Sequence, residues 1–251
     1  MQYIVFDLEF NQDFSSQNVN DAATSLPKNL FEIIQIGSVK LGSDLQTVAT
    51  FSRYVKPTIF TKINTFVTDL TGITTEQLMS EKSFPNVYEE FADFAQCKEA
   101  VLCVWGLTDI RELFRNAGYH HLDQSLLPRS FINVQPYVSK HLKLSSKKQL
   151  RLETAVEALD IPKTYAFHDA LYDAYYTAEV FKRIYDASIK PAFYDPARIS
   201  IKTGQRKVKR EIDFDALLKQ FEKMYARELS EEEQGMVKLA YKMGRTNQFI
   251  K

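Results

Sequence analysis

Four carboxylates and one histidine lie at three separated points of this chain, and each point follows a stretch that is expected to be buried. These residues are Asp7, Glu9, Asp109, His168 and Asp173. The apolar run Tyr-Ile-Val-Phe at residues 3–6 precedes the first pair, and the run at residues 101–105 precedes the third acid. Four acids gathered in one fold cannot all stay ionised without cations. The pattern therefore constrains the fold, and it predicts a site for divalent metal ions and phosphodiester chemistry.

Apolar and periodic runs predict the order of the secondary structure. We expect strands at residues 3–6, 33–41, 51–57, 101–105 and 131–134. We expect helices at residues 74–79, 87–94, 109–117, 152–159 and 169–185. The first three strands are consecutive and indicate an antiparallel meander, and helices and strands alternate afterwards. This order predicts an α/β domain in which helices flank a mixed sheet of five strands.

The character of the sequence changes after residue 188. Pro191 and Pro196 punctuate a segment that is typical of a linker, and a basic run follows at residues 202–210. Two helical patterns come next, and the second opens with Ser230 and Glu233 at capping-box spacing. We therefore predict one domain at residues 1–188 and an extension at 189–251, made of a basic linker and a helical hairpin.

Composition gives few further constraints. The 32 Lys and Arg balance the 32 Asp and Glu, so the net charge says nothing about nucleic acid. Cys97 and Cys103 lack the spacing of metal ligands, and two isolated thiols suit a reducing compartment. Asp7 and Glu9 stand where a signal peptide would need apolar residues, and no run of about 18 apolar residues exists. We therefore expect a cytoplasmic protein without a membrane span.

The spacing of the acids limits how they can meet. Side chains two positions apart on a strand share a face, so Asp7 and Glu9 can bind one cation together. His168 and Asp173 are five positions apart, which on a continuous helix would rotate one from the other by about 140°. They can converge only if His168 precedes the helix and Asp173 lies in its first turns. Asp169 is a suitable N-cap for such a helix.

Taken singly, each of these residues has an ordinary structural explanation, such as an acid at a strand end or near a helix N-terminus. In order, they resemble the DEDDh class of the DnaQ-like 3′–5′ exonuclease superfamily. The motifs that carry the resemblance are Asp-Leu-Glu at 7–9, Trp-Gly-Leu-Thr-Asp at 105–109 and His-Asp-Ala-Leu-Tyr-Asp at 168–173. The connecting segments at 32–39, 54–57 and 69–74 look like the branch of RNase T, KapD and the RNA-interference-related exonucleases. The resemblance covers residues 1 to about 188.

The resemblance implies an RNase H-like fold and hydrolysis of the 3′-terminal nucleotide of single-stranded nucleic acid by two Mg²⁺ ions, for which Mn²⁺ would substitute. It implies that Asp7 bridges both metals and that Glu9 and Asp173 complete the site of the metal that carries the attacking water. Asp109 would serve the second metal through water. His168 would be the general base, or would mainly orient the water.

Other residues are candidates for substrate binding. By the resemblance, Leu8 and Phe10 would wedge against or stack on the terminal nucleotide, and the alternative is that both are core residues. The basic run offers phosphate contacts through Lys202, Arg206, Lys207, Lys209 and Arg210, and its alternative is a solvated loop. The chain departs from the family in the long loop before Glu32 and in residues 165–168, which lack the glycine often found before the histidine.

The main functional hypothesis is a metal-dependent 3′–5′ exonuclease that releases nucleoside 5′-monophosphates, with RNA as the preferred strand. One alternative is a DNA proofreading or repair exonuclease. An alternative of another class is a non-catalytic regulatory module that binds protein or nucleic acid. The hairpin could pack on the catalytic domain or pair with an identical or a different chain, and the sequence does not choose between these.

Overall fold

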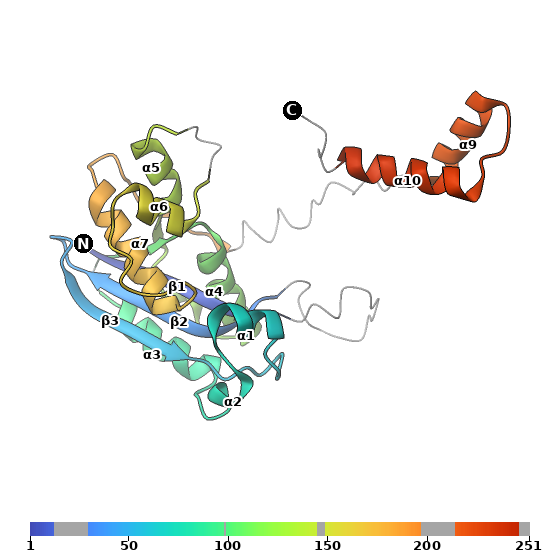
Figure 1. Cartoon of the computed structure of the whole chain (residues 1–251). Coiled ribbons are helices and arrows are strands. Elements are labelled where there is room, and N and C mark those ends of the chain that lie inside the picture. Colours follow the sequence, from blue (N-terminus) through green and yellow to red (C-terminus); the bar gives the residue numbers. More distant parts are fainter. Residues whose placement is uncertain (13–29, 98, 145–148, 197–213, 246–251) are drawn as a thin grey trace. The chain divides into compact units, whose positions relative to one another are not determined.

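The computed structural model describes residues 1–12, 30–97, 99–144, 149–196 and 214–245. The chain divides into two compact units, Met1–Ile199 and Ser200–Lys251. The first unit contains the sheet and the helices that cover it, and the second contains the helices α9 and α10 (Figure 1). The predicted boundary after residue 188 stays a prediction. Ile189 and Tyr194, which lie within the predicted linker, are buried in the core of the first unit.

A mixed sheet forms the centre of the first unit, with the strand order β3-β2-β1-β4-β5-β6. The strands are β1 (Gln2–Asn11), β2 (Glu32–Leu41), β3 (Thr47–Tyr54), β4 (Ala100–Val104), β5 (Ser130–Asn133) and β6 (Ala192–Phe193). The first three form the expected antiparallel meander, and β4 and β5 run parallel to β1. The sheet has six strands rather than the predicted five, because the two-residue β6 pairs antiparallel with β5. A strand this short between two prolines has no hydrophobic pattern.

The helices of the first unit follow the predicted order, with two additions. They are α1 (Thr65–Thr71), α2 (Thr75–Leu78), α3 (Phe84–Ala95), α4 (Thr108–Tyr119), α5 (Val134–His141), α6 (Leu152–Ala158) and α7 (Ala170–Ile184), with a 3-10 turn at Gln124–Leu126. The sequence patterns do not predict α1 and α5. Helix α1 has only seven residues and buries only Val67, while its other large apolar side chains, Phe66 and Leu70, are exposed, so it presents no clear core face. Helix α5 begins directly after β5, so its first residue continues the apolar run that predicts a strand at residues 131–134.

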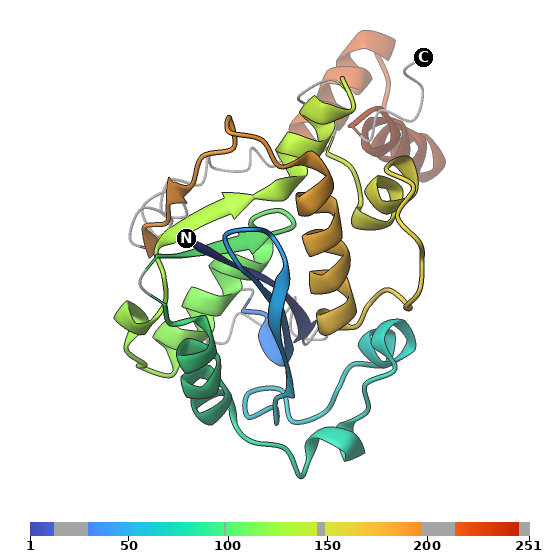
Figure 2. The ribbon, with the colours of Figure 1, turned by 90° about the vertical axis from the view of Figure 1, so that its left-hand side faces the viewer.

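Two apolar clusters hold the layers together, one on each face of the sheet. On one face, Ile4 and Phe6 of β1 pack with residues of α3 and α4. On the other face, Tyr3 and Val5 pack with residues of α5, α6 and α7. Helix α7 lies along the strands (Figure 2). Because side chains alternate along a strand, the residues of β1 with odd numbers share the face that α7 covers.

The second unit is a hairpin of α9 (Phe214–Tyr225) and α10 (Glu231–Arg245). The predicted capping box is present, because the Ser230 amide donates to Glu233 Oε2 at 2.9 Å and the Glu233 amide donates to Ser230 Oγ at 3.3 Å. Glu233 also forms an ion pair of 2.7 Å with Arg227. The basic residues proposed to bind substrate, Lys202, Arg206, Lys207, Lys209 and Arg210, lie outside the described residues, as does most of the long loop after Glu9.

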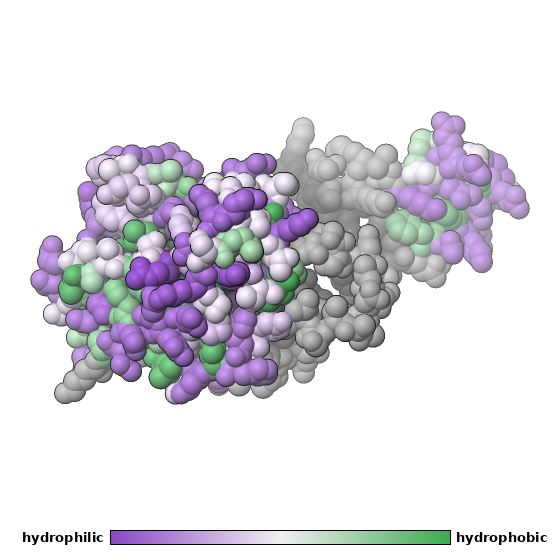
Figure 3. Space-filling model, turned by 90° about the horizontal axis from the view of Figure 1, so that it is seen from below, coloured by the Kyte–Doolittle hydropathy of each residue, from purple (hydrophilic) through white to green (hydrophobic). Residues whose placement is uncertain are grey.

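In the described parts of the chain, no helix combines the length and apolarity that crossing a membrane requires. Hydrophobic residues on the surface shown in Figure 3 form small patches among hydrophilic ones. Such a mixture is usual for protein surfaces in water.

Candidate active site

Two of the candidate acids are carried by the central strand of the sheet. Asp7 and Glu9 lie on β1, opposite Gly37 and Gln35 of β2. The parallel partner β4 pairs with β1 only as far as Val5, so both acids extend beyond its end. Both have odd numbers and therefore face α7, as Tyr3 and Val5 do. Glu9 is buried, with 9% of its surface exposed, and Asp7 is half-buried.

The third acid lies in the first turn of α4, after the turn that ends β4. Gly106 adopts φ 88°, a conformation that glycine reaches without steric cost. Its amide donates to Asn133 Oδ1 at 3.0 Å, and this bond joins the turn to the end of β5. Asp109 is buried, with 6% of its surface exposed. The position at the helix N-terminus favours a carboxylate, because the helix dipole is positive there.

The last two candidates lie at the start of α7, in the arrangement that their spacing predicts. Asp169 is the N-cap, and its Oδ1 accepts from the amides of Leu171 and Tyr172 at 2.9 and 3.2 Å. Asp173 lies in the first turn. His168 precedes the helix, has an exposed side chain, and donates its amide to Asp173 Oδ2 at 3.2 Å.

Strand β2 sets the position of this helix start through two residues that the sequence patterns do not predict as part of the site. A Cβ atom on Gly37 would lie 2.0 Å from main-chain atoms of Ala170 and Leu171, so only glycine permits the close approach. Gln35 donates to Asp169 Oδ2 at 2.9 Å and accepts from the Ala170 amide at 3.2 Å. Their signals in the sequence are a glutamine and a glycine that interrupt the run of isoleucines at positions 33, 34 and 36.

The acids perturb one another in the absence of cations. Burial, together with the charges of Asp173 and Asp109, raises the pKa of Glu9 to about 8. Burial, with the charge of Asp173, raises the pKa of Asp109 to about 7 against an opposing hydrogen bond to its own backbone. Burial also raises the pKa of Asp173 to about 6, although its bond from the His168 amide opposes the shift. The pKa of Asp7 lies well above its usual value because of burial and the charges of the other three acids.

This arrangement suits divalent cations. Glu9, His168 and Asp173 each offer a ligand atom, and these atoms lie within 4.8 Å of one another. Asp173 Oδ1 is buried and has no hydrogen-bond partner among the described residues. A buried carboxylate oxygen without a partner is costly, and a bound cation would supply the missing interaction. Carboxylate oxygens are hard ligands of the kind that Mg²⁺ and Mn²⁺ prefer.

The two apolar neighbours of these acids have different surroundings. Leu8 is buried, with 3% of its surface exposed, and belongs to the core cluster on the α3 and α4 face. Phe10 is half-buried, and its ring lies 5.7 Å from that of Phe31. The position of Leu8 agrees with the core alternative. A contact of either residue with a nucleotide stays a prediction.

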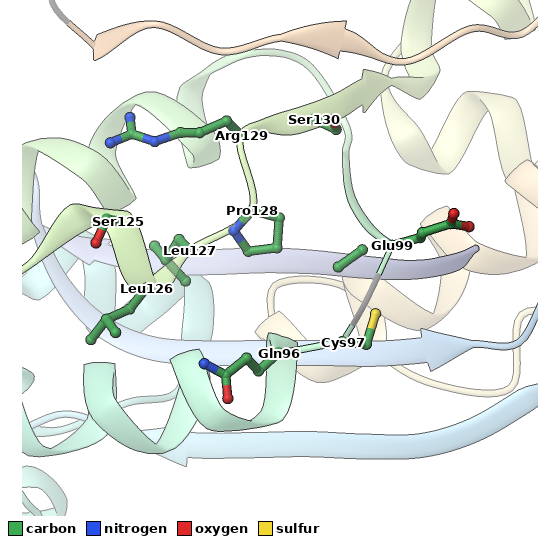
Figure 4. A pocket seen from close by; sticks show the side chains of 10 residues that line it. Gln96, Cys97, Glu99, Ser125, Leu126, Leu127, Pro128, Arg129 and Ser130 are labelled. Carbon is green, nitrogen blue, oxygen red and sulfur yellow. The ribbon is translucent and has the colours of Figure 1, made fainter.

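An open hollow of about 390 Å³ lies elsewhere in the first unit (Figure 4). Its lining includes Glu99, Ala100, Arg129 and Ser130, at the points where β4 and β5 begin. The acids follow the opposite ends of the parallel strands. The hollow is therefore not part of the candidate active site.

The segment that contains the four candidate acids and His168 is similar in sequence to a known protein family. Residues 4–181 match the family model RNase_T, which describes an exonuclease. The PolC-type DNA polymerase III of Caldanaerobacter subterraneus subsp. tengcongensis is 30% identical over 186 residues, 72% of this chain and 11% of that protein. The probable 3′-5′ exonuclease KapD of Bacillus subtilis is 28% identical over 161 residues, 63% of this chain and 76% of that protein. Human 3′-5′ exoribonuclease 1 is 36% identical over 74 residues, 29% of this chain and 21% of that protein. The chain thus spans a small part of the PolC-type protein and of the human enzyme.

A solved structure has the same fold. The nuclease domain of 3′hExo, a DEDDh family member bound to rAMP, matches with a TM-score of 0.64 at 21% identity. The match covers 77% of this chain and 96% of that chain. The six-stranded mixed sheet with its flanking helices is therefore the expected RNase H-like architecture.

Proposed function

The chain belongs to the RNase_T family of exonucleases, and from this membership we propose that it removes nucleotides from the 3′ ends of single-stranded nucleic acid. The products would be nucleoside 5′-monophosphates. DEDDh exonucleases of this family use divalent metal ions. The observation that carries the proposal is one acidic site built from β1, α4 and α7, in which burial raises the pKa values of all four carboxyl groups and neighbouring acids raise those of Asp7, Glu9 and Asp109 further.

We propose that Asp7, Glu9, Asp109 and Asp173 would hold two Mg²⁺ ions, with Mn²⁺ as a substitute. When bound, such a pair of ions activates a water molecule and stabilises the leaving oxygen of the phosphodiester. The unpartnered Oδ1 of Asp173 and the raised pKa values of the buried acids support this assignment. Each carboxylate would regain a low pKa beside a cation, because an opposite charge favours the ionised form.

His168 would take a proton from the attacking water at one of its imidazole nitrogens. Its side chain is exposed to solvent, and one of its nitrogens lies within 4.8 Å of carboxylate oxygens of Glu9 and Asp173. Histidine is the side chain that most often serves as a general base in enzymes. The same position would also let the imidazole orient the water.

We propose RNA as the preferred strand. The relatives include an exoribonuclease, and the nuclease of the same fold was solved with rAMP. The PolC-type relative instead favours the alternative, a DNA proofreading or repair exonuclease. An oligomer formed through the α9 and α10 hairpin stays a prediction.

Digestion of matched RNA and DNA oligonucleotides labelled at the 3′ end tests the proposal. The full chain should release labelled mononucleotide with Mg²⁺ or Mn²⁺, should release none in EDTA, and should digest RNA faster. Faster digestion of DNA would favour the proofreading or repair role. Binding that persists in EDTA, with no mononucleotide product under any condition, would instead support the non-catalytic regulatory module.

A further inference from the structure

The backbone of His168 has an unusual conformation that its surroundings must maintain. Its φ is 68°, in the left-handed region that residues other than glycine rarely adopt. Such a conformation persists only where neighbouring contacts determine it. The side chain is exposed, so the residue is held by its own amide, which donates to Asp173 Oδ2 at 3.2 Å, and by the contacts of its neighbours in the chain.

Tyr176 of α7 contacts two residues of this segment, Tyr165 and Phe167, from inside the core. Its hydroxyl accepts a hydrogen bond from the amide of Tyr165 at 2.7 Å and donates one to the Tyr165 carbonyl oxygen at 2.7 Å. Its ring stacks on that of Phe167 with a centroid distance of 4.7 Å. Tyr176 itself is fully buried, with 0% of its surface exposed. One side chain therefore fixes both the main chain at residue 165 and the side chain at residue 167.

Further contacts hold the chain on both sides of His168. The ring of Tyr165 stacks on Tyr172, with centroids 4.4 Å apart and planes within 4°. After His168, Gln35 and the cap bonds hold Asp169. His168 is thus one residue between two anchored points, and Tyr176 is the buried group that anchors the first of them.

We propose that Tyr176 is a positioning residue, which keeps the imidazole of His168 beside Glu9 and Asp173 without touching substrate. The proposal rests on the proposed function, in which His168 receives the proton. Without the hydroxyl, the amide and the carbonyl of Tyr165 lose their shared partner. The segment then gains conformations in which the imidazole points away from the carboxylates.

The test replaces Tyr176 by Phe, which removes the hydroxyl and keeps the ring on Phe167. We expect kcat to fall about tenfold while KM for a 3′-labelled oligonucleotide changes less than about twofold, because only the reacting geometry is altered. Tyr88→Phe is the matched control. Tyr88 is equally buried and donates its hydroxyl to the Asp123 carbonyl at 2.9 Å, in the other core cluster. This control should keep the kcat of the parent chain.

A double-mutant cycle separates positioning from general stability. If Tyr176 acts through His168, the substitution Tyr176→Phe should cause no further loss of kcat in a His168→Ala background. An undiminished loss in that background would overturn the proposal, and so would an unchanged kcat in the single variant. If Tyr176→Phe folds poorly, the variant Phe167→Leu removes the ring that stacks on Tyr176 at a partly exposed position. We expect Phe167→Leu to lower kcat by the same factor in the parent chain and to cause no further loss in the His168→Ala background.

A measurement without catalysis distinguishes this proposal from the proposed function. The imidazole proton resonances of His168 in the metal-free full chain should shift or broaden with Tyr176→Phe and stay unchanged with Tyr88→Phe. Unchanged resonances in both variants would overturn the positioning role even if the parent chain is an active exonuclease. A parent chain without activity, combined with shifted resonances, would refute the proposed function alone.

Discussion

The main-chain amide of His168 donates a hydrogen bond to Oδ2 of Asp173 at 3.2 Å, which joins the candidate base to a candidate metal ligand. The bond occupies one oxygen of the carboxylate and leaves Oδ1 buried without a partner among the described residues. The helix start thus orients both residues towards β1. The geometry of the site therefore depends on this hydrogen bond at the start of α7 as much as on the acids themselves.

Removal of one central carboxylate should abolish the proposed activity. Asp7→Asn keeps the shape of the side chain but removes its charge, and we expect metal-dependent release of mononucleotides to fall by about a thousandfold or more. Asp93→Asn is the control, because Asp93 is an exposed acid near the end of α3. Activity of Asp7→Asn equal to that of the control, in the same mononucleotide assay, would contradict the assignment.

The metal-free chain should become less stable as the pH rises from about 4 to about 8. A carboxyl group with a raised pKa in the folded state stabilises the fold fully below its unfolded pKa, and that stability is lost as the pH rises through the folded pKa. The folded values here are about 6 for Asp173, about 7 for Asp109 and about 8 for Glu9. The midpoint of thermal unfolding, measured in EDTA across this pH range, should fall as the pH rises.

The cause of this pH dependence can be tested by adding a metal ion and by removing one of the acids. Mg²⁺ or Mn²⁺ should raise the midpoint of unfolding most at pH 8, where the ionised acids repel one another without cations. Glu9→Gln should make the decline with pH less steep in EDTA. A midpoint that rises between pH 5 and pH 8 without metal would show that the acids do not share one buried site.

A methyl group at Gly37 should displace the start of α7. The added Cβ would overlap main-chain atoms of Ala170 and Leu171, so Gly37→Ala should destabilise the chain by about 2–3 kcal/mol and reduce activity. Gly235→Ala is the control, since a Cβ there meets no atom within 4 Å and alanine favours the helix α10. Urea unfolding and the mononucleotide assay measure the two effects. Equal stability and activity in both variants would show that the close approach is unimportant.

The basic run should act on strand binding and leave the chemistry unchanged. Replacing Lys207, Lys209 and Arg210 by Gln should weaken binding of a single strand and make its salt dependence shallower, by about 0.7 in the logarithmic slope for each lost phosphate contact. The kcat at a saturating concentration of single-stranded oligonucleotide should stay the same. Fluorescence titrations at several salt concentrations check this, and an unchanged affinity and slope would favour a solvated loop.

Local sequence was sufficient for most of the secondary structure and for the order of the acids. The meander, the alternation that follows it and the position of His168 before its helix all depend on short-range patterns of apolar, capping and turn residues. The resemblance to DEDDh exonucleases added the family and the fold, and the match of residues 4–181 to RNase_T confirms the family. Short elements that bury few residues, such as the seven-residue α1 and the two-residue β6, could not be found in this way.

The sequence by itself determined which side chains could form the site, because strand alternation and helix spacing decide which residues share a face. Only the tertiary structure decided where those faces meet. Gly37 and Gln35 bring β2 against the start of α7, and Tyr176 joins that helix to the segment before His168. These contacts connect residues far apart in the chain, or depend on how a side chain is oriented in the packed core. The raised pKa values follow from the same packing, since burial and mutual approach exist only once the layers have assembled.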